Sequence, residues 1–358
     1  MKTRNNRQLY TSLWLLACSL ILPFSVAHAE NWSDKVTIKG FASSVYQKTN
    51  EAEYFNGEAK ENGIDENGSV QGTKLGININ ANISDRVTIA SQLFATAGEN
   101  YVVHVDWAFV ALNLTDDLTL RTGKVKYPVG IVNEYRDVGY LYPWIAAPLS
   151  IYSLVSPNGP QATREAFSGS SLLWGKSFDS MTYGVDLFAG EVNLSGSDVR
   201  KLNGLTVKAD WDDKVLFQAS TYKGTMYNAT PAAMNGKDHE AIVFGFKVDW
   251  NNYIAYAETS DVKMGSLTAM KSESSYLTLG YRLGKWLPYV TAQKYQQGEV
   301  DDKQTINQLG LRYDIFANTA IKFEVGTIKT DKGQGLFTDG APSKDSVSIY
   351  GIAIDTTF

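Results

Sequence analysis

Apolar and polar residues alternate in short segments along most of the chain. In the last segment, SVSIYGIAIDTTF (346–358), Tyr350, Ile352 and Ile354 share one face with the terminal Phe358. A period of two residues is the pattern of a β-strand with two different faces. Chain termini of soluble domains are usually polar and frayed. An apolar face that continues to the last residue therefore favours a strand that faces lipid.

The same alternation predicts a strand in each of sixteen segments: 35–48, 69–81, 86–97, 102–114, 118–126, 165–177, 181–192, 202–211, 215–222, 240–250, 253–263, 274–283, 286–297, 304–314, 319–329 and 346–358. Most are long enough for a tilted membrane crossing of about 9–11 residues. In segment 102–114, the alternation places Trp107 and Phe109 on the apolar, lipid-facing side with Val103 and Val105.

The links between these segments are of two kinds. Tight turns such as Asn251–Asn252 and Gly284–Lys285 follow the even segments, whereas mostly long polar links follow the odd ones. Short turns on one side and long loops on the other are typical of bacterial outer-membrane barrels. The sequence therefore predicts an all-β fold, a closed transmembrane antiparallel β-barrel of sixteen strands. A large secreted soluble β-protein is the alternative.

The N-terminus has the pattern of a secretory leader. Lys2, Arg4 and Arg7 precede the mostly apolar stretch 9–26, and the small-residue motif Ala27-His28-Ala29 follows it. This order predicts a signal peptide at residues 1–29 and a mature chain, 30–358, that is one barrel domain. Cys18 ends a Leu-Leu-Ala-Cys stretch that resembles a lipoprotein cleavage box, which is the alternative processing site.

Composition then excludes several functions. Cleavage after Ala29 removes the single cysteine, so thiol catalysis and cysteine metal sites are excluded, and we expect no cofactor. The formal charge falls from −5 to −8 because the leader carries three cations and no acids. No basic cluster of the nucleic-acid-binding type is present. No mature stretch approaches the length of apolar sequence that a membrane helix needs.

Two stretches carry a family resemblance. The terminal Phe358, with apolar residues at alternating positions before it, resembles the C-terminal signature of Gram-negative outer-membrane proteins, and the whole mature chain resembles a general-porin type barrel. The resemblance implies an integral outer-membrane protein, a homotrimer, contact with membrane lipid and lipopolysaccharide, and recognition of Phe358 by the barrel-assembly machinery. The stretch Arg121–Gly130, RTGKVKYPVG, is similar to the phosphate-selective and DcaP-like porins. The dense basic ladders of phosphate channels and the N-terminal coiled coil of DcaP-like porins are not apparent.

The candidate site follows from the third loop after an odd segment, residues 127–164, which is the longest and is rich in Pro, Tyr and Trp. In porins of this size that loop folds into the barrel. We therefore predict a pore constriction formed by Arg121, Lys124, Lys126, Glu134, Arg136, Asp137 and Arg164. With apolar faces toward lipid, the predicted pore lumen contains Lys74, Asp106, Asp186, Lys208, Lys247, Glu258, Arg282, Arg312, Lys322 and Glu324.

The predicted function is passive diffusion of small hydrophilic solutes and ions through a water-filled channel. Nine lumenal cations (those above with Lys39, Arg86 and Arg121) against four acids favour a weak anion preference. Several alternatives remain. Tyr140, Tyr142, Trp144 and Tyr152 could form a stacking track in a channel specific for a sugar, and a carboxylate-specific channel is a related possibility. His104 beside Asp106 could serve an outer-membrane enzyme, whereas His239 is expected in a solvated loop. The polar loops 49–68, 223–239 and 330–345 would suit an adhesin or receptor.

Overall fold

The computed structural model describes residues 35–56, 63–153, 166–194, 197–229, 232–265, 271–298, 302–331, 333–338 and 340–358. Residues 1–34, which include the predicted signal peptide, lie outside the described residues. Residues 37–358 form one compact unit. Among the described residues, no helix is long and apolar enough to cross a membrane.

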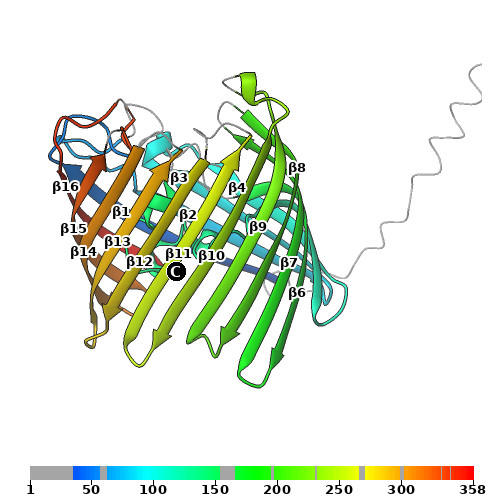
Figure 1. The fold of residues 1–358 in the computed structure, drawn as a ribbon. Helices are drawn as coiled ribbons and strands as arrows, with labels where there is room; N and C mark the ends of the chain where they lie inside the picture. The colour runs from blue at the N-terminus through cyan, green and yellow to red at the C-terminus, as the bar shows by residue number, and fades with distance from the viewer. Residues whose placement is uncertain are drawn as a thin grey trace, which may run out of the picture. The chain divides into compact units, whose positions relative to one another are not determined.

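Across the described residues, sixteen antiparallel strands close into a barrel in which neighbours in sequence are neighbours in the sheet (Figure 1). The predicted fold class and strand number are confirmed. The strands are β1 (Val36–Thr49), β2 (Lys74–Ser84), β3 (Val87–Thr96), β4 (His104–Asn113), β5 (Leu118–Lys126), β6 (Ala166–Phe178), β7 (Met181–Leu194), β8 (Ser197–Trp211), β9 (Val215–Tyr227), β10 (Asp238–Trp250), β11 (Tyr253–Met264), β12 (Lys271–Tyr281), β13 (Trp286–Gln297), β14 (Asp302–Phe316), β15 (Thr319–Asp331) and β16 (Val347–Thr357).

The barrel closes through the first and last strands. β1 pairs antiparallel with β16, from Phe41 opposite Thr357 to Thr49 opposite Ile349. Gly40 and Phe358 exchange two backbone hydrogen bonds of 2.8 and 2.9 Å beyond that ladder. The Phe358 ring lies against Gly40, where an added Cβ would be 2.3 Å from the ring. The terminal residue is therefore paired in the sheet, and its ring is 65% exposed on the outer face.

The residues in one of the short turns suit the backbone conformation that this turn requires. Asn251 and Asn252 join β10 to β11, with Trp250 opposite Tyr253, and both asparagines have positive φ. A two-residue hairpin of this kind requires that conformation, which asparagine tolerates. Trp250 directly precedes this turn, and Trp211 directly precedes the turn between β8 and β9. The two rings pack edge to face, with their centroids 5.5 Å apart.

The links on the opposite side differ in length from the prediction. The links after β1, β5, β9 and β15 are long. Those after β7, β11 and β13 are shorter than predicted, because at least one of the two strands that each link joins is longer than predicted. β7 runs to Leu194 and β8 begins at Ser197, so the expected link of about nine residues shrinks to 195–196. The expectation of mostly long links on this side is wrong for these hairpins.

A bulge in β4 corrects a second prediction. Gln92 pairs with Trp107 and Leu93 with Val105, so Asp106 is the extra residue. A bulge exchanges the faces of the residues that follow it. Phe109 accordingly packs against an apolar cluster inside the barrel and stacks on Trp107 at 5.6 Å. The placement of Trp107 and Phe109 on the lipid side with Val105 is therefore wrong.

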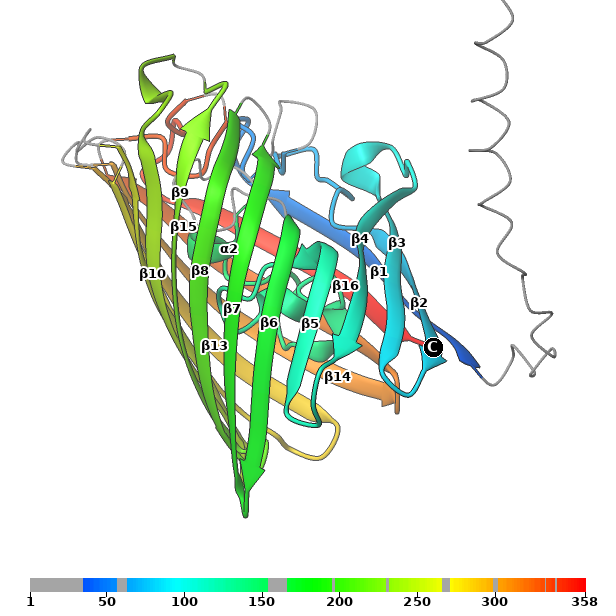
Figure 2. The same cartoon turned by 90° about the vertical axis from the view of Figure 1, so that its right-hand side faces the viewer.

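The long link after β5 occupies the barrel interior (Figure 2). Its described part, residues 127–153, is called the inward loop and contains the short helices η3 (Asn133–Tyr135), η4 (Gly139–Leu141) and α2 (Leu149–Tyr152). Its apolar side chains pack against inward residues of the wall in one buried cluster, which includes Val132, Tyr142, Trp144, Ile151, Ile254, Tyr256, Leu287 and Tyr289. Burial of these side chains holds the loop inside the barrel.

Candidate functional site: the inward loop and the barrel wall

The stretch Arg121–Gly130 forms the entry to the inward loop, and two of its glycines are required by geometry. Gly123 has φ +136°, and a Cβ there would be 2.4 Å from the Ala108 carbonyl oxygen of β4. Gly130 has φ +83°, and a Cβ there would be 2.6 Å from the Tyr152 hydroxyl. Residues other than glycine rarely adopt a positive φ, because the Cβ atom then approaches the backbone too closely. These glycines let the chain leave β5 and turn sharply into the barrel.

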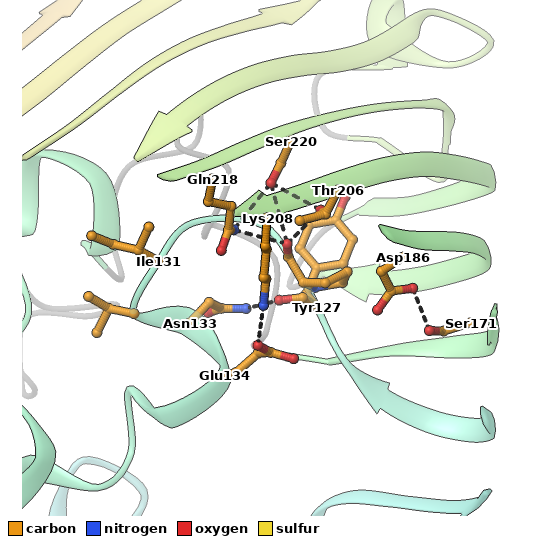
Figure 3. Close-up of polar contacts among 12 residues, drawn as sticks. Tyr127, Ile131, Asn133, Glu134, Ser171, Asp186, Thr206, Lys208, Gln218 and Ser220 are labelled. Carbon is orange, nitrogen blue, oxygen red and sulfur yellow. Dashed lines mark hydrogen bonds and ion pairs between the residues drawn. The ribbon is translucent and has the colours of Figure 1, made fainter. Parts of the chain in front are cut away.

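The next contact fixes the loop against β8 and β9. The Pro128 carbonyl accepts hydrogen bonds from Thr206 Oγ1 at 2.7 Å, Gln218 Nε2 at 3.3 Å and Ser220 Oγ at 3.4 Å. Figure 3 shows these polar side chains pointing from the two strands toward the loop. The three donors satisfy a buried carbonyl that has left the β-ladder, because an unpaired buried carbonyl would be costly.

Glu134 of the loop faces cationic side chains of the wall. Lys208 Nζ donates to Glu134 Oε2 at 2.6 Å, and both side chains remain about one-third exposed, at 31% and 38% (Figure 3). Burial raises the pKa of Glu134, but the charges of Lys208, Arg121 and Lys126 outweigh it and hold the pKa below its usual value. Glu134 is therefore ionised at neutral pH and forms a direct ion pair with Lys208 that remains partly exposed to water.

Arg121 has a separate partner on the wall. Its guanidinium donates to Asp186 Oδ2 at 2.5 Å and to Ser171 Oγ at 3.0 Å. Ser171 in turn donates to Asp186 Oδ1 at 2.5 Å. This arrangement orients Arg121 along β5–β7 and neutralises most of its charge locally.

A second ionic group joins the loop to β3–β5. Lys126 Nζ lies 2.6 Å from Asp137 Oδ2 and 3.2 Å from Asp106 Oδ2. Gln92 Nε2 donates to both carboxylates, at 2.9 and 3.0 Å. One ammonium therefore bridges a carboxylate of the loop and a carboxylate of the wall. Sequence reasoning found Lys126, Asp106 and Asp137 but missed Gln92, which an alternating pattern cannot distinguish from other polar lumen residues.

The remaining predicted constriction residues are placed differently. Lys124 donates to the Val105 carbonyl at the seam between β4 and β5, at 3.0 Å. Arg136 contributes its backbone carbonyl, which accepts from Lys74 Nζ at 3.3 Å and from the Tyr142 hydroxyl at 2.9 Å. Arg164 lies outside the described residues. The structure thus brings Lys74 to the inward loop, although it was predicted only as a lumen residue.

Glu258 holds the middle of the inward loop. Its carboxylate accepts from the Ile131 backbone N–H at 2.7 Å and from the hydroxyls of Tyr152 and Tyr276 at 2.6 and 2.7 Å. The Tyr152 hydroxyl itself accepts from the Val132 N–H at 3.1 Å. Glu258 is 3% exposed. A buried carboxylate with three donors positions the loop backbone, so Glu258 acts on the loop instead of lining open water.

Lys322 holds the later part of the loop. Its ammonium is fully buried, lies 2.8 Å from Asp355 Oδ2 and donates to the carbonyls of Gly139 and Trp144, each at 2.7 Å. Arg312 donates to the Tyr140 carbonyl at 2.6 Å. Both cations were predicted in the lumen, and their contacts fix the loop.

The other predicted lumen residues contact side chains of the barrel wall. The Tyr289 hydroxyl donates to Glu324 at 2.7 Å, and Arg282 forms an ion pair with Asp249. Lys247 lies over the Tyr256 ring, 5.7 Å from its centroid, and forms no ion pair among the described residues.

The loop aromatics do not form a stacking surface. Tyr142, Trp144 and Tyr152 are each 1% exposed. The Trp144 indole N–H donates to Thr278 and Thr291 at 2.9 and 3.1 Å. Three of the four aromatics suggested for a sugar track are therefore unavailable for stacking, because their faces are used for packing. The fourth, Tyr140, is half-buried and has the Arg312 guanidinium 4.7 Å from its ring centroid. Their spacing in sequence gave no means of separating packing from stacking.

The histidines give no support to a catalytic arrangement. His104 Nδ1 lies 3.2 Å from Glu99 of the adjoining loop. His239 is 2% exposed and packs on Tyr222 with ring centroids 5.4 Å apart. The expectation of a solvated His239 is wrong, because β10 begins at Asp238, earlier than predicted. Among the described residues, no cluster of His, Cys, Asp and Glu suits a metal ion.

Comparison with known proteins assigns the family. Residues 17–333 match the family model for Gram-negative porins, whereas no curated protein sequence matches the chain. Among solved structures, the chain is similar to an anion-selective porin from Comamonas acidovorans, at 13% identity and TM-score 0.61, over 90% of this chain and 99% of that one. It is also similar to the trimer form of OmpT, an outer membrane protein of Vibrio cholerae, at 12% identity and TM-score 0.56, over 91% and 100%. A third similar structure is the outer membrane channel DcaP of Acinetobacter baumannii, at 11% identity and TM-score 0.54, over 90% and 97%.

At these identities the solved structures show a shared fold alone, whereas the family model covers most of the chain. A closed barrel of sixteen strands with a loop packed inside it is consistent with that family. The chain belongs to the Gram-negative porin family and is an integral protein of the outer membrane.

Proposed function

We propose that the protein is a diffusion channel for small hydrophilic solutes and ions, with its constriction between the inward loop and the wall of β3–β8. The observation that carries this proposal is the position of Glu134 opposite Lys208, 2.6 Å apart and both partly exposed. This partly exposed ion pair presents one charge of each sign to the water beside it, at the junction of the loop and the wall, and so creates a local field there. Arg121 and Lys126 add to the positive potential at Glu134, whereas Lys126 and Asp137 are buried against each other and support the loop.

The selectivity that these charges support is weak. At least five of the nine cations predicted in the lumen have an acidic partner. The pairs are Arg121–Asp186, Lys208–Glu134, Arg282–Asp249, Arg312–Asp314 and Lys322–Asp355. Paired charges largely cancel for a passing ion. Lys247, without an ion-pair partner among the described residues, leaves the wall slightly positive. We therefore infer a weak anion preference.

Planar-bilayer recording of the purified protein under a salt gradient tests both parts. Stepwise conductance with a reversal potential that favours chloride is expected. The Lys247→Gln variant should lose most of the preference while retaining conductance, and Lys285→Gln, at an exposed turn, is the matched control. Absence of conductance from folded protein would overturn the channel, whereas cation preference would overturn only the selectivity.

We also propose a homotrimer, supported by exposed apolar residues above the shorter strands. Tyr101, Val102 and Val103 in the link between β3 and β4 are 54%, 62% and 65% exposed. β2–β5 contain 9 to 11 residues each, so this link lies close to the membrane surface. Contact with another copy would cover these side chains. Native mass spectrometry should give a trimer that Val102→Asp weakens; an unchanged trimer in the variant would remove this link from the interface.

A further inference from the structure

Three methionine side chains gather at the end of β9–β11 that lies opposite the short turns (Figure 2). Met226 of β9, Met264 of β11 and Met234 pack with Ala229 in one buried cluster, and each of the four is at most 6% exposed. Met234 ends the short helix η5 (Ala232–Met234) in the link between β9 and β10. The cluster therefore brings thioether side chains from three elements together near the extracellular mouth of the barrel.

His239 of β10 adjoins this cluster. It lies opposite Met264 in the β10–β11 register and opposite Gly224 in the β9–β10 register, two residues before Met226. Side chains in register share a face of the sheet, with Cβ atoms about 5 Å apart when directly opposite and Cα atoms about 7–8 Å apart on the diagonal. The side chains of His239, Met226 and Met264 are all buried. Because methionine is long and flexible, the imidazole and both thioethers lie within reach of one ion.

The imidazole of His239 carries a polar atom without a partner. The side chain is 2% exposed, yet its Nδ1 has no hydrogen-bond partner in the part of the chain that the structure describes. The Tyr222 ring packs against the imidazole, with centroids 5.4 Å apart, and holds it in place. A buried nitrogen without a hydrogen bond is costly, and a bound ion is one of the partners that can satisfy it. The adjacent acids Asp238 and Glu240 point to the other face of β10, so neither carboxylate joins the group.

We propose that Met226, Met234, Met264 and His239 form a site for one soft monovalent cation, Cu(I). Thioether sulfur favours Cu(I), and imidazole is a common copper ligand. The four side chains supply neither thiolate nor carboxylate, so they lack the negative charge and the oxygen ligands that Ca²⁺ and Mg²⁺ require. Plain packing would need only apolar volume, which leucine supplies as well as methionine does. Replacement of methionine by leucine therefore separates ligation from packing.

The experiment titrates the detergent-purified protein with Ag(I), a redox-inert analogue of Cu(I), in chloride-free buffer and counts bound ions by native mass spectrometry. We expect one Ag(I) per chain, which excess Cu(I) should displace under anaerobic conditions. Met234→Leu should weaken binding at least about tenfold, since even the loss of a residue that only orients a metal ligand can cost this much. His239→Gln should weaken it as well. Met181→Leu, at the turn between β6 and β7, is the matched control and should bind Ag(I) as the wild-type protein does.

Three outcomes would overturn the proposal. Absence of bound Ag(I) on the wild-type protein would exclude the site. Equal Ag(I) affinity of Met234→Leu and the wild-type protein would reduce the methionine cluster to packing. Equal affinity of the wild-type protein for Zn(II) and Ag(I) would exclude selection by soft ligands. Heat-modifiable migration verifies that each variant is folded, and no step depends on conductance, so failure of the proposed channel would leave this test intact.

Discussion

Neutralising Glu134 should make the channel clearly more anion-selective. Glu134→Gln keeps the size of the side chain and its capacity to accept a hydrogen bond from Lys208, which lies 2.6 Å away. The change removes one negative charge from the partly exposed pair, so Lys208 is left uncompensated opposite the inward loop. Because Pro128, Ile131 and the later residues hold the loop through other contacts, the loop itself should stay in place.

The magnitude follows from Coulomb's law. A unit charge about 6 Å from the ion path interacts by about 0.7 kcal/mol in water. Screening over a Debye length of about 10 Å at 0.1 M salt reduces this to about 0.4 kcal/mol, a factor of about 2 for each ion. Because anions gain and cations lose, the ratio of chloride to potassium permeability should rise about fourfold. Lys208→Gln should lower the ratio by a similar factor.

The assay is the reversal potential in planar bilayers under a tenfold salt gradient, with single-channel conductance recorded in parallel. Asp238→Asn, which removes an acid from an exposed ion pair at the outer end of β10, is the control of equal charge change. The reasoning is refuted if Glu134→Gln leaves the permeability ratio within the range of that control. It is also refuted if the ratio moves toward cations.

Other contacts give predictions on stability, pH and assembly. Lys322→Met leaves Asp355 buried without its ion-pair partner, so the unfolding free energy, measured by urea unfolding in micelles, should fall by about 3–5 kcal/mol. The double variant Lys322→Met with Asp355→Asn should recover part of that loss. A single variant as stable as the wild-type protein would contradict the role of Lys322 in stabilising the barrel. The pKa of Glu134 is held below its usual value, so the carboxylate stays charged on mild acidification. The ratio of anion to cation permeability should therefore stay constant from pH 7 to about 5 and shift toward anions only at lower pH. A shift in that ratio already at pH 6 would contradict the lowered pKa. Phe358→Ser removes the ring that lies against Gly40 and should lower the yield of heat-modifiable barrel in outer membranes, while equal yield would show that the ring is not needed for assembly.

The candidate site was predictable in its residue types but not in its pairings. Lys126, Asp137 and Glu134 could be assigned to a loop–wall interface because long inward loops need polar contacts with the wall. Their partners could not be assigned, because β8 and β15 are remote in sequence from the loop and only barrel closure brings Lys208 and Lys322 to it. Glu258 was recognised as lumenal, whereas its role in binding the Ile131 N–H depends on where the loop backbone passes.

The sequence by itself determined the strands, their number and the closed barrel, because a period of two residues with apolar faces and short turns on one side has a single stable solution in lipid. Tertiary structure alone decided which faces the residues of β4 take, because the extra residue Asp106 is visible only as a mismatch with β3. It also decided that Trp144 and Tyr152 are buried supports and that most lumenal charges are paired. Those outcomes depend on contacts between distant segments, for which local alternation contains no information.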